Sequence, residues 1–340
     1  MWGKLQLAQA SGARPESSMS HMRIRLISAL FLAVSTSSAQ ELYRMEKSAD
    51  AMGATFTVAL YGTDRSQMET AIDAALAEAQ RLDALLSNYR PETEWSTVNR
   101  TAATRPVNVS PELFRLLAAC LDYSRESDGA FDITVGPLMK IWGFYKSSGH
   151  LAPKSEVDAA LGKIGYRHVH LDPAGQTVAF DVPGIELDPG GIGKGYAVDR
   201  MVDILKQKGC ERALVAGSDS SIYGLGAPPD EPRGWEVSIR DPKNARRSVA
   251  QVFLKNMSLS TSGSYEKFFQ ADGRIYSHIM DPRTGYPAQG TVSVSVVTPL
   301  TIDSEAWAKP YFVNGRQWTL AHHRADFRVF LCDAKCGWVE

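Results

Sequence analysis

The spacing of apolar residues in the first third of the chain predicts one strand followed by two helices. Residues 41–62 alternate and are rich in β-favouring residues around 54–60, which predicts a strand there. Ser110 followed by Pro111 predicts the start of a helix that runs to about Ser127, because serine caps a helix and proline fits its first position. The other predicted helix spans residues 65–86, where the apolar residues recur at helical spacing. They form one face of Met68, Ile72, Ala75, Leu76, Ala79, Leu82 and Leu86.

The remaining two thirds of the chain predict more strands than helices. Helices are predicted at residues 154–161, from about 196 to 208, and around 304–313. The elements intersperse without a regular βαβ rhythm and no linker divides residues 40–340, so we expect a single α+β domain of mixed sheets and helices. The predicted strands lie at residues 168–171, 177–180, 213–216, 235–240, 250–254, 292–297 and 327–332.

The amino-acid composition indicates a globular protein and says little more about its fold or function. Of the 340 residues, 44% are hydrophobic and 22% charged, which is ordinary for a protein with a large core. The 37 basic and 38 acidic residues give a net charge of -1, so the balance provides no electrostatic case for nucleic acid as a partner.

The N-terminal 39 residues have the layout of an upstream segment followed by a secretory signal peptide. Residues 22–25 are positively charged, residues 26–34 are apolar, and Ser37 and Ala39 supply small residues before Gln40. The apolar run is too short to span a bilayer. A buried N-terminal helix is the alternative, but the three features together favour export, so a periplasmic or otherwise extracytoplasmic location is expected.

Four cysteines leave the disulfide state open. Cys332 and Cys336 are close in sequence and an exported protein can form disulfides, so this pair is a candidate. The other two are Cys120 and Cys210, of which Cys120 lies in a predicted helix and is expected to be a buried apolar residue. The cysteine spacing does not resemble a zinc site.

A glycine-rich segment at residues 190–195 is the first candidate for chemistry. Its glycines would allow a ligand to approach the backbone, and the N-terminus of the helix that follows favours an anion. The spacing around Lys194 matches neither the phosphate-binding loop G-x-x-x-x-G-K-[ST] nor the dinucleotide pattern G-x-G-x-x-G. An ordinary glycine-rich turn therefore remains an equal alternative.

Two further segments carry candidate side chains. Phe131 could cover a flat ring and Asp132 could accept from a ribose or base, although a turn with a core anchor explains that pair better. His278 is a candidate acid or base, Asp281 a candidate partner, and residues 282–285 a fixed turn.

Together these segments resemble the FAD:protein FMN transferases, the ApbE-type flavin transferases. The resemblance rests on residues 188–199, 261–265 and 278–285, and extends to further matches at residues 52–56, 86–89 and 129–143. It covers about residues 45–335 and implies a single ApbE-type (T-fold-like) domain, mostly periplasmic in the family.

The resemblance also implies an activity and its partners. Such enzymes split the pyrophosphate of FAD with Mg²⁺, attach FMN through a phosphoester to a Thr or Ser of an acceptor protein, and release AMP. The acceptors are exported or membrane-bound electron-transfer proteins, which implies proximity to a membrane and no nucleic acid.

Site residues follow from the same resemblance. His278 falls at the position credited with activating the acceptor hydroxyl, and Gly191 and Glu305 fall at metal-binding positions. The positions implied to hold FAD are Met52, Tyr89, Ala130, Phe131, Asp132, Asp188, Lys194, Thr261, Ser262, Gly263, His278 and Asp281.

The sequence departs from the family pattern at the metal site. The family has Asp-Ala-Leu-Ala-Thr, with Asp and Thr as Mg²⁺ ligands, whereas residues 305–309 here are Glu-Ala-Trp-Ala-Lys. Lys309 therefore stands at the Thr position, and a protonated lysine has no acceptor atom for a hard metal. Using Asp303 as the ligand would instead place Trp307 at the Thr position. Milder departures are Ser218, Pro189 and Gly193, where the family tends to have Gly, Leu and Ala.

Three hypotheses follow from this departure. In the first, which the near-complete motifs favour, the protein is an FMN transferase and the Lys309 ammonium, held by Glu305, replaces part of the metal's charge. In the second, the metal site is lost and the protein binds FAD without transferring FMN. In the third, water replaces the acceptor and the protein is an FAD pyrophosphatase.

Overall fold

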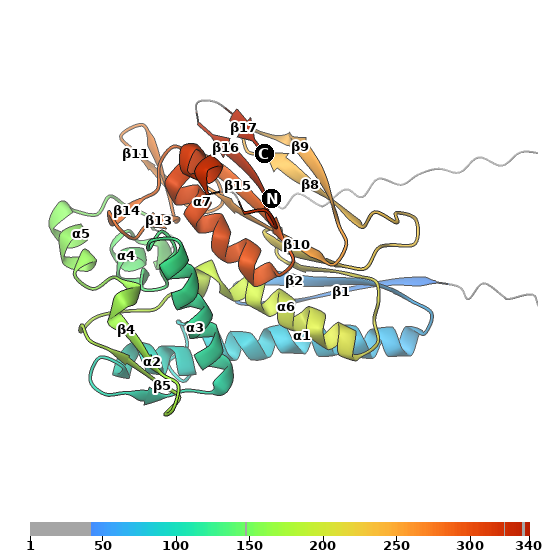
Figure 1. Ribbon diagram of the computed structural model, residues 1–340, viewed down its shortest axis with the longest axis horizontal. Helices are drawn as coiled ribbons and strands as arrows, with labels where there is room; N and C mark the ends of the chain where they lie inside the picture. Colours follow the sequence, from blue (N-terminus) through green and yellow to red (C-terminus); the bar gives the residue numbers. More distant parts are fainter. Residues whose placement is uncertain (1–41, 147, 323, 335–336) are drawn as a thin grey trace, which may run out of the picture. The chain divides into compact units, whose positions relative to one another are not determined.

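An antiparallel eight-stranded sheet forms the centre of the fold in the computed structural model, which describes residues 42–146, 148–322, 324–334 and 337–340 (Figure 1). Glu41–Glu340 make up one compact unit. The order of strands is β1-β2-β6-β7-β10-β15-β16-β17, and every neighbouring pair is antiparallel. The strands are β1 (Tyr43–Ala51), β2 (Ala54–Gly62), β6 (Ala213–Gly217), β7 (Ser221–Leu225), β10 (Met257–Gly263), β15 (Thr291–Thr298), β16 (Arg328–Asp333) and β17 (Gly337–Val339).

Three long helices, α1 (Arg65–Leu86), α6 (Gly193–Gln207) and α7 (Thr301–Ala321), pack against this sheet as a layer. Helix α6 lies between the other two, with α1 over β1 and β2 and α7 over β10 and β15. Strand residues alternate between the two faces of a sheet, so Val215 and Tyr223 join the core under the helices while their neighbours point the other way. The opposite face is covered by the ribbon of β8 (Trp235–Asp241) and β9 (Asn244–Leu254).

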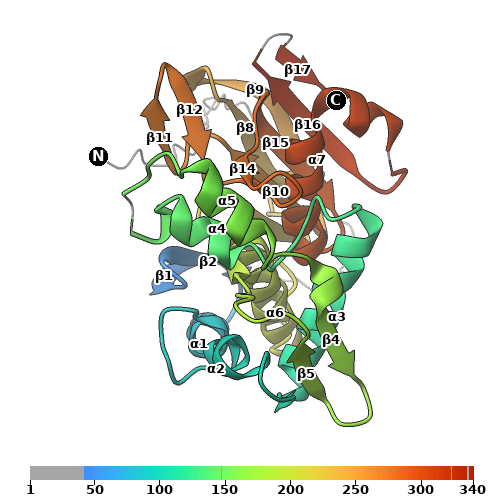
Figure 2. The same ribbon diagram turned by 90° about the vertical axis from the view of Figure 1, so that its left-hand side faces the viewer.

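Two smaller substructures flank the helical layer. One combines α2 (Glu94–Thr101) and α3 (Pro111–Glu126) with a sheet of β3 (Val107–Asn108), β5 (Thr177–Phe180) and β4 (Val169–Asp172), and η2 (Tyr166–His168) precedes β4. The other combines α4 (Gly136–Ile141), η1 (Phe144–Lys146) and α5 (Lys154–Leu161) with the hairpins β11–β12 (Phe268–Ala271, Arg274–Ser277) and β13–β14 (Met280–Asp281, Tyr286–Pro287). Figure 2 shows the β11–β12 hairpin beside α4 and α5.

Most elements predicted from local patterns are confirmed. The helices at residues 65–86, 111–126 and 154–161 and the strands at 177–180, 213–217 and 291–298 form as expected. The single strand predicted over residues 41–62 is wrong: Met52 and Gly53, both at positive φ, turn the chain there, and β1 and β2 pair as an antiparallel hairpin. The mixture of helices with an antiparallel sheet confirms the α+β prediction. Within the described residues, none of the helices is both long and apolar enough to cross a membrane. The predicted signal peptide and Cys336 lie outside the described residues. The signal peptide and the candidate disulfide between Cys332 and Cys336 therefore stay predictions.

Two predicted helix boundaries are wrong. Helix α6 begins at Gly193 rather than near residue 196, and α7 spans residues 301–321 rather than 304–313. The reason at α6 is tertiary packing, since a Cβ on Gly195 would lie 2.5 Å from the carbonyl oxygen of Thr301. Only glycine lets α6 approach α7 this closely, so glycines that predicted a break are instead the first turn of the helix.

The start of α7 is held by a side chain from α6. Asp199 accepts hydrogen bonds from the backbone N–H groups of Thr301 and Ile302, each at 2.8 Å. Replacing Asp199 by alanine is therefore expected to destabilise the fold by about 1–2 kcal/mol, as for other lost helix caps. Urea unfolding followed by circular dichroism measures this. Asp203→Ala, which removes an ion pair with Arg200 on the same helix, is the control and should have the smaller effect; equal effects would contradict the capping role.

Candidate functional site

A buried carboxylate between two lysines lies where the start of α6 meets α7. Glu305 is 2% exposed, and its Oε1 atom lies 3.2 Å from Lys194 Nζ and 4.0 Å from Lys309 Nζ. The Gly195 N–H donates to the other carboxylate oxygen, Oε2. Lys309, one turn later on α7, also donates to the backbone carbonyl of Glu305 at 2.9 Å. We call Lys194, Glu305 and Lys309 the lysine–glutamate cluster.

The cluster carries one excess positive charge. Burial alone would raise the pKa of Glu305, but the charges of Lys194 and Lys309 outweigh it and hold that pKa below its ordinary value. Glu305 is therefore a carboxylate at neutral pH. Burial lowers the pKa of Lys309 to about 8, although Glu305 opposes the change. Two ammonium groups around one carboxylate are suited to receive an anion.

The glycine-rich segment lies beside this cluster. Residues 189–191 form a short helix, η3 (Pro189–Gly191), and α6 begins directly after it. A Cβ on Gly191 would lie 3.4 Å from the Phe131 ring and 3.6 Å from Lys309 Cε, so the segment packs between an aromatic ring and the lysine. The N-terminus of the 15-residue helix α6 adds backbone N–H groups and a positive dipole end. The segment therefore favours the anion-site interpretation over an ordinary turn.

Asp188 fixes the start of this segment. Its Oδ1 atom accepts from the Gly190 N–H at 2.6 Å, and its Oδ2 atom accepts from the Tyr145 hydroxyl at 2.5 Å. Burial raises the pKa of Asp188, while these hydrogen bonds oppose the rise. Sequence reasoning missed Tyr145, although it lies two residues after the quoted residues 129–143.

His278 lies between β12 and β13 and is held by Lys267. Its Nδ1 atom is 3.2 Å from the Lys267 carbonyl oxygen, and its backbone N–H donates to the same oxygen at 3.0 Å. Because a carbonyl only accepts, Nδ1 carries the proton and Nε2 is the acceptor. Burial, helped by the charges of Lys267, Lys194 and Lys309, lowers the pKa of His278 to about 4, although the hydrogen bond to the Lys267 carbonyl opposes the change. These interactions place a neutral imidazole in the field of the lysine–glutamate cluster.

The predicted turn after His278 is confirmed. Backbone N–H groups of Thr284 and Gly285 donate to the Asp281 carbonyl, and Trp142 Nε1 donates to the Gly285 carbonyl at 2.9 Å. The Asp281 carboxylate accepts from the backbone N–H and side chain of Arg283. Asp281 therefore stabilises the turn that follows His278.

Met52 and Tyr89 occupy two different settings around the glycine-rich segment. Met52 adopts a positive φ of 53° and donates its N–H to Asp83, and its sulfur lies near Gly193 at the start of α6. Tyr89 is 71% exposed and meets the Tyr145 ring edge-on, with ring centres 5.8 Å apart. An exposed aromatic ring beside the Asp188–Tyr145 pair is available to a ligand.

Ala130, Phe131 and Asp132 are all buried, and the Asp132 carboxylate is already used by the protein. It accepts from the backbone N–H and hydroxyl of Thr134 at 2.8 and 2.7 Å and from the Tyr166 N–H at 2.7 Å. Phe131 packs edge-on against Tyr123. This geometry matches the turn and core anchor that the sequence alone favoured, and the implied role of Asp132 toward FAD stays a prediction.

Thr261, Ser262 and Gly263 form the end of β10. The Thr261 hydroxyl lies 2.8 Å from that of Ser295 on β15, and the Tyr265 ring fills the space a Gly263 side chain would take. Strand β10 is joined to α7 next to Glu305, because the hydroxyls of Ser260 and Ser304 are 2.8 Å apart. The segment thus supports the helix that carries the cluster, and its implied contacts with FAD stay predictions.

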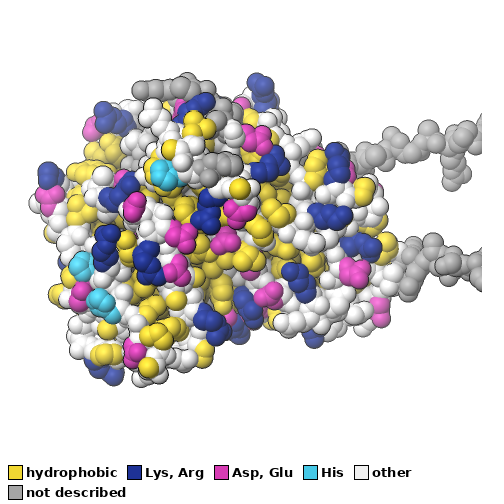
Figure 3. Space-filling view, viewed as in Figure 1, with side chains coloured by type: hydrophobic (Ala, Val, Ile, Leu, Met, Phe, Trp, Pro, Cys, Tyr) yellow, Lys and Arg dark blue, Asp and Glu magenta, His cyan; other side chains and the backbone are white. Residues whose placement is uncertain are grey.

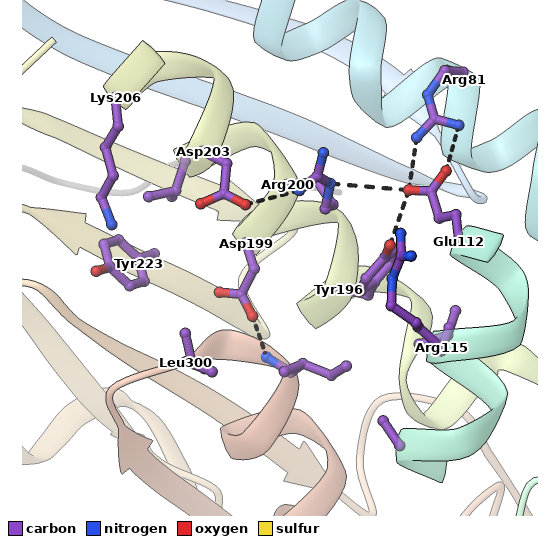
Figure 4. Close-up of a pocket in the computed structure, with 14 residues that line it drawn as sticks. Arg81, Glu112, Arg115, Tyr196, Asp199, Arg200, Asp203, Lys206, Tyr223 and Leu300 are labelled. Carbon is purple, nitrogen blue, oxygen red and sulfur yellow. Dashed lines mark hydrogen bonds and ion pairs between the residues drawn. The ribbon is translucent and has the colours of Figure 1, made fainter. Parts of the chain in front are cut away.

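A separate cavity of about 500 Å³ opens along another face of α6 (Figure 4). None of the predicted site residues lines it, and several of its charged side chains pair with one another, including Arg200 with Asp203 and Arg81 with Glu112. The surface in Figure 3 likewise has basic and acidic side chains interspersed. The chemistry is therefore expected at the lysine–glutamate cluster rather than in this cavity.

Comparison with known proteins identifies the family. Residues 52–331 match the model of the ApbE family. The chain belongs to the ApbE family. It is 33% identical over 276 residues to a protein of Salmonella typhimurium named FAD:protein FMN transferase, covering 78% of this chain and 77% of the relative. A protein of the same name from Treponema pallidum is 32% identical over 264 residues, covering 74% and 73%.

Solved structures of ApbE proteins share the fold. The flavinyl transferase ApbE of Pseudomonas stutzeri, in its apo form, superposes with a TM-score of 0.76 at 30% identity, covering 88% of this chain and 94% of that one. The ApbE protein of Thermotoga maritima gives a TM-score of 0.79 at 28% identity, covering 86% and 94%. The resemblance found in the sequence and the prediction of an enzyme of this family are thereby confirmed.

Proposed function

We propose that the protein is an FAD:protein FMN transferase that attaches FMN through a phosphoester to a Thr or Ser of an acceptor protein and releases AMP. The observation that carries this proposal is the neutral His278 in the field of the lysine–glutamate cluster. A base and a cationic anion site are the two requirements of phosphoryl transfer to a hydroxyl. Relatives named for this activity, at about 30% identity, support the choice of substrate.

The proposed step is a displacement at phosphorus. The acceptor hydroxyl oxygen attacks the phosphorus of the FMN half of FAD, and the bond from that phosphorus to the bridging oxygen breaks. The bridging oxygen leaves with the electron pair as part of AMP, while His278 Nε2 takes the hydroxyl proton. Positive charge from the cluster stabilises the negative charge that develops on the leaving phosphate.

We further propose an extracytoplasmic location and an exported or membrane-bound acceptor. The support is the sequence of residues 22–39, with its positive, apolar and small-residue regions in the order of a signal peptide. Fractionation of cells that express the full chain tests the location, and recovery of the protein only with the cytoplasm would exclude it.

The activity is tested by incubating the purified full-length protein with FAD and an acceptor domain that a related transferase flavinylates. Covalent flavin fluorescence on the acceptor in a denaturing gel, with equimolar AMP by chromatography, is expected. FMN and AMP without labelled acceptor would replace the proposal by FAD pyrophosphatase activity. Intact FAD that stays bound to the protein would leave the FAD-binding hypothesis.

The rate of transfer is expected to stay constant as the pH falls from neutrality to about 5. Histidine is a base only while neutral, and burial lowers the pKa of His278 to about 4 from its ordinary value of 6.5. The acid limb of the pH–rate profile should therefore have its midpoint near pH 4. Circular dichroism at each pH checks that the protein is still folded. A midpoint near 6.5 would mean that another group is the base.

A further inference from the structure

The donor atoms around Glu305 do not fit the Mg²⁺ site that the family pattern implies. Both carboxylate oxygens are already engaged, Oε1 by Lys194 and Oε2 by the Gly195 N–H. Lys309 stands where a hydroxyl ligand would, and its ammonium group has no lone pair. Magnesium requires several oxygen ligands in near-octahedral geometry. Here the Glu305 carboxylate is shared with two cations, and Lys309 supplies no ligand.

Other carboxylates near the cluster are also committed. Asp303 accepts from the Tyr123 hydroxyl at 2.5 Å, and Asp199 accepts from the first two N–H groups of α7. Over the ranges that the structure describes, there is no group of three or more His, Cys, Asp and Glu side chains arranged to hold a metal ion. A divalent cation at Glu305 would also stand close to two ammonium groups, which repel it.

The two lysines can themselves supply the missing positive charge. Lys309 is only 20% exposed, and its one short hydrogen bond, to the Glu305 carbonyl, leaves two N–H donors for a ligand. Glu305 Oε1 lies within 4.0 Å of both Lys194 and Lys309, and Lys309 also lies against Gly191, next to the N-terminus of α6. Lysine binds phosphate as a point charge, and here two point charges and a helix dipole converge.

We propose that Lys309 and Lys194, positioned by Glu305, bind the pyrophosphate of FAD in place of a divalent cation, so that this protein transfers FMN without Mg²⁺. The inference rests on the proposed function and specifies how its site neutralises the leaving phosphate. Phosphoryl transfer needs positive charge at the oxygens where negative charge develops, and ammonium groups fixed in a protein meet that need without a metal.

The first test compares metal-free and Mg²⁺-containing reactions of the full-length protein. Transfer is expected to differ by less than about twofold between excess chelator and Mg²⁺. Lys309→Met, which keeps an unbranched side chain one atom shorter and removes its charge, should lower transfer by about 10²-fold, and added Mg²⁺ should not restore it. Lys206→Met, which removes an exposed lysine elsewhere on α6, is the matched control and should leave transfer unchanged. Transfer that stops in chelator would overturn the inference.

The second test measures metal binding directly and does not depend on activity. Titration with Mn²⁺, followed by electron paramagnetic resonance, should show no stoichiometric site in the wild-type protein. The double variant Lys309→Thr with Glu305→Asp removes one of the two ammonium groups and adds a hydroxyl ligand, so it should bind one Mn²⁺ and require Mg²⁺ for transfer. A wild-type Mn²⁺ site that Glu305→Gln abolishes would contradict the inference.

The two tests separate this inference from the proposed function. If the wild-type protein transfers FMN only with Mg²⁺, the function stands and the lysine pair is not the cation. If the wild-type protein transfers FMN under neither condition, the function fails, and the Mn²⁺ titration still decides whether lysines have replaced the metal. Circular dichroism of each variant shows whether a lower rate of transfer results from loss of the folded structure.

Discussion

Replacing His278 by alanine is expected to lower the rate of FMN transfer by about 10²–10⁴-fold, the range that general-base catalysis contributes in enzymes. The imidazole is electrostatically coupled to the lysine–glutamate cluster, since the charges of both Lys194 and Lys309 lower its pKa. Its Nδ1 proton is fixed by the Lys267 carbonyl, which leaves Nε2 to accept the hydroxyl proton. Fluorescence of the labelled acceptor over time measures the rate.

The same variant should still bind FAD, because the anion site is built from α6, η3 and α7 rather than from the loop that carries His278. Equilibrium titration with FAD checks this. His170→Ala, which removes a surface histidine paired with Asp181, is the control and should transfer at the wild-type rate. Undiminished transfer by His278→Ala would remove His278 from its assigned role, whereas loss of FAD affinity in that variant would make it a binding residue.

Helix α1 could be predicted because the pattern that specifies it is local. In residues 65–86 the apolar face recurs every three or four residues, and α1 buries that face against β1, β2 and α6. Strands β7 and β10 carry no comparable signal, since β10 is mostly serine, threonine and glycine. Their stability comes from neighbouring strands and from hydroxyl contacts such as Ser258 with Thr298, which are distant in sequence. No local pattern encodes such contacts.

The candidate site was predictable only in part for the same reason. Glu305 and Lys309 are four residues apart, so a helix alone places them on one face. Their meeting with Lys194 and Gly195 joins segments 110 residues apart, and residue patterns alone could not supply it. The family resemblance joined these two segments only by placing Gly191 and Glu305 at one metal site, and it did not give the contacts of Glu305 with Lys194 and Gly195. Tyr145 and Lys267, which hold Asp188 and His278, were missed because neither belongs to a quoted motif.

Removal of the Glu305 side chain should have the largest effect on stability of any single change at the site. In Glu305→Ala, Lys194 and Lys309 lose the carboxylate that compensates them, and the Gly195 N–H loses its acceptor. Breaking a buried ion pair by removing one partner costs about 3–5 kcal/mol, and partial exposure of both lysines places the expected loss nearer about 3 kcal/mol. Urea unfolding of the full-length protein measures the loss.

The neutral variant Glu305→Gln separates charge from packing. Its amide oxygen can still accept from one neighbour, so it should unfold at a urea concentration between those of the wild type and Glu305→Ala. Both variants should also lose most FMN transfer, because the lysines are no longer held together beside the glycine-rich segment. Glu156→Ala, on the exposed face of α5, serves as the control and should match the wild type in both measurements. If Glu305→Ala were as stable as that control, the carboxylate would not be what holds the two ammonium groups in place, and the charge arrangement assigned to this site would be wrong.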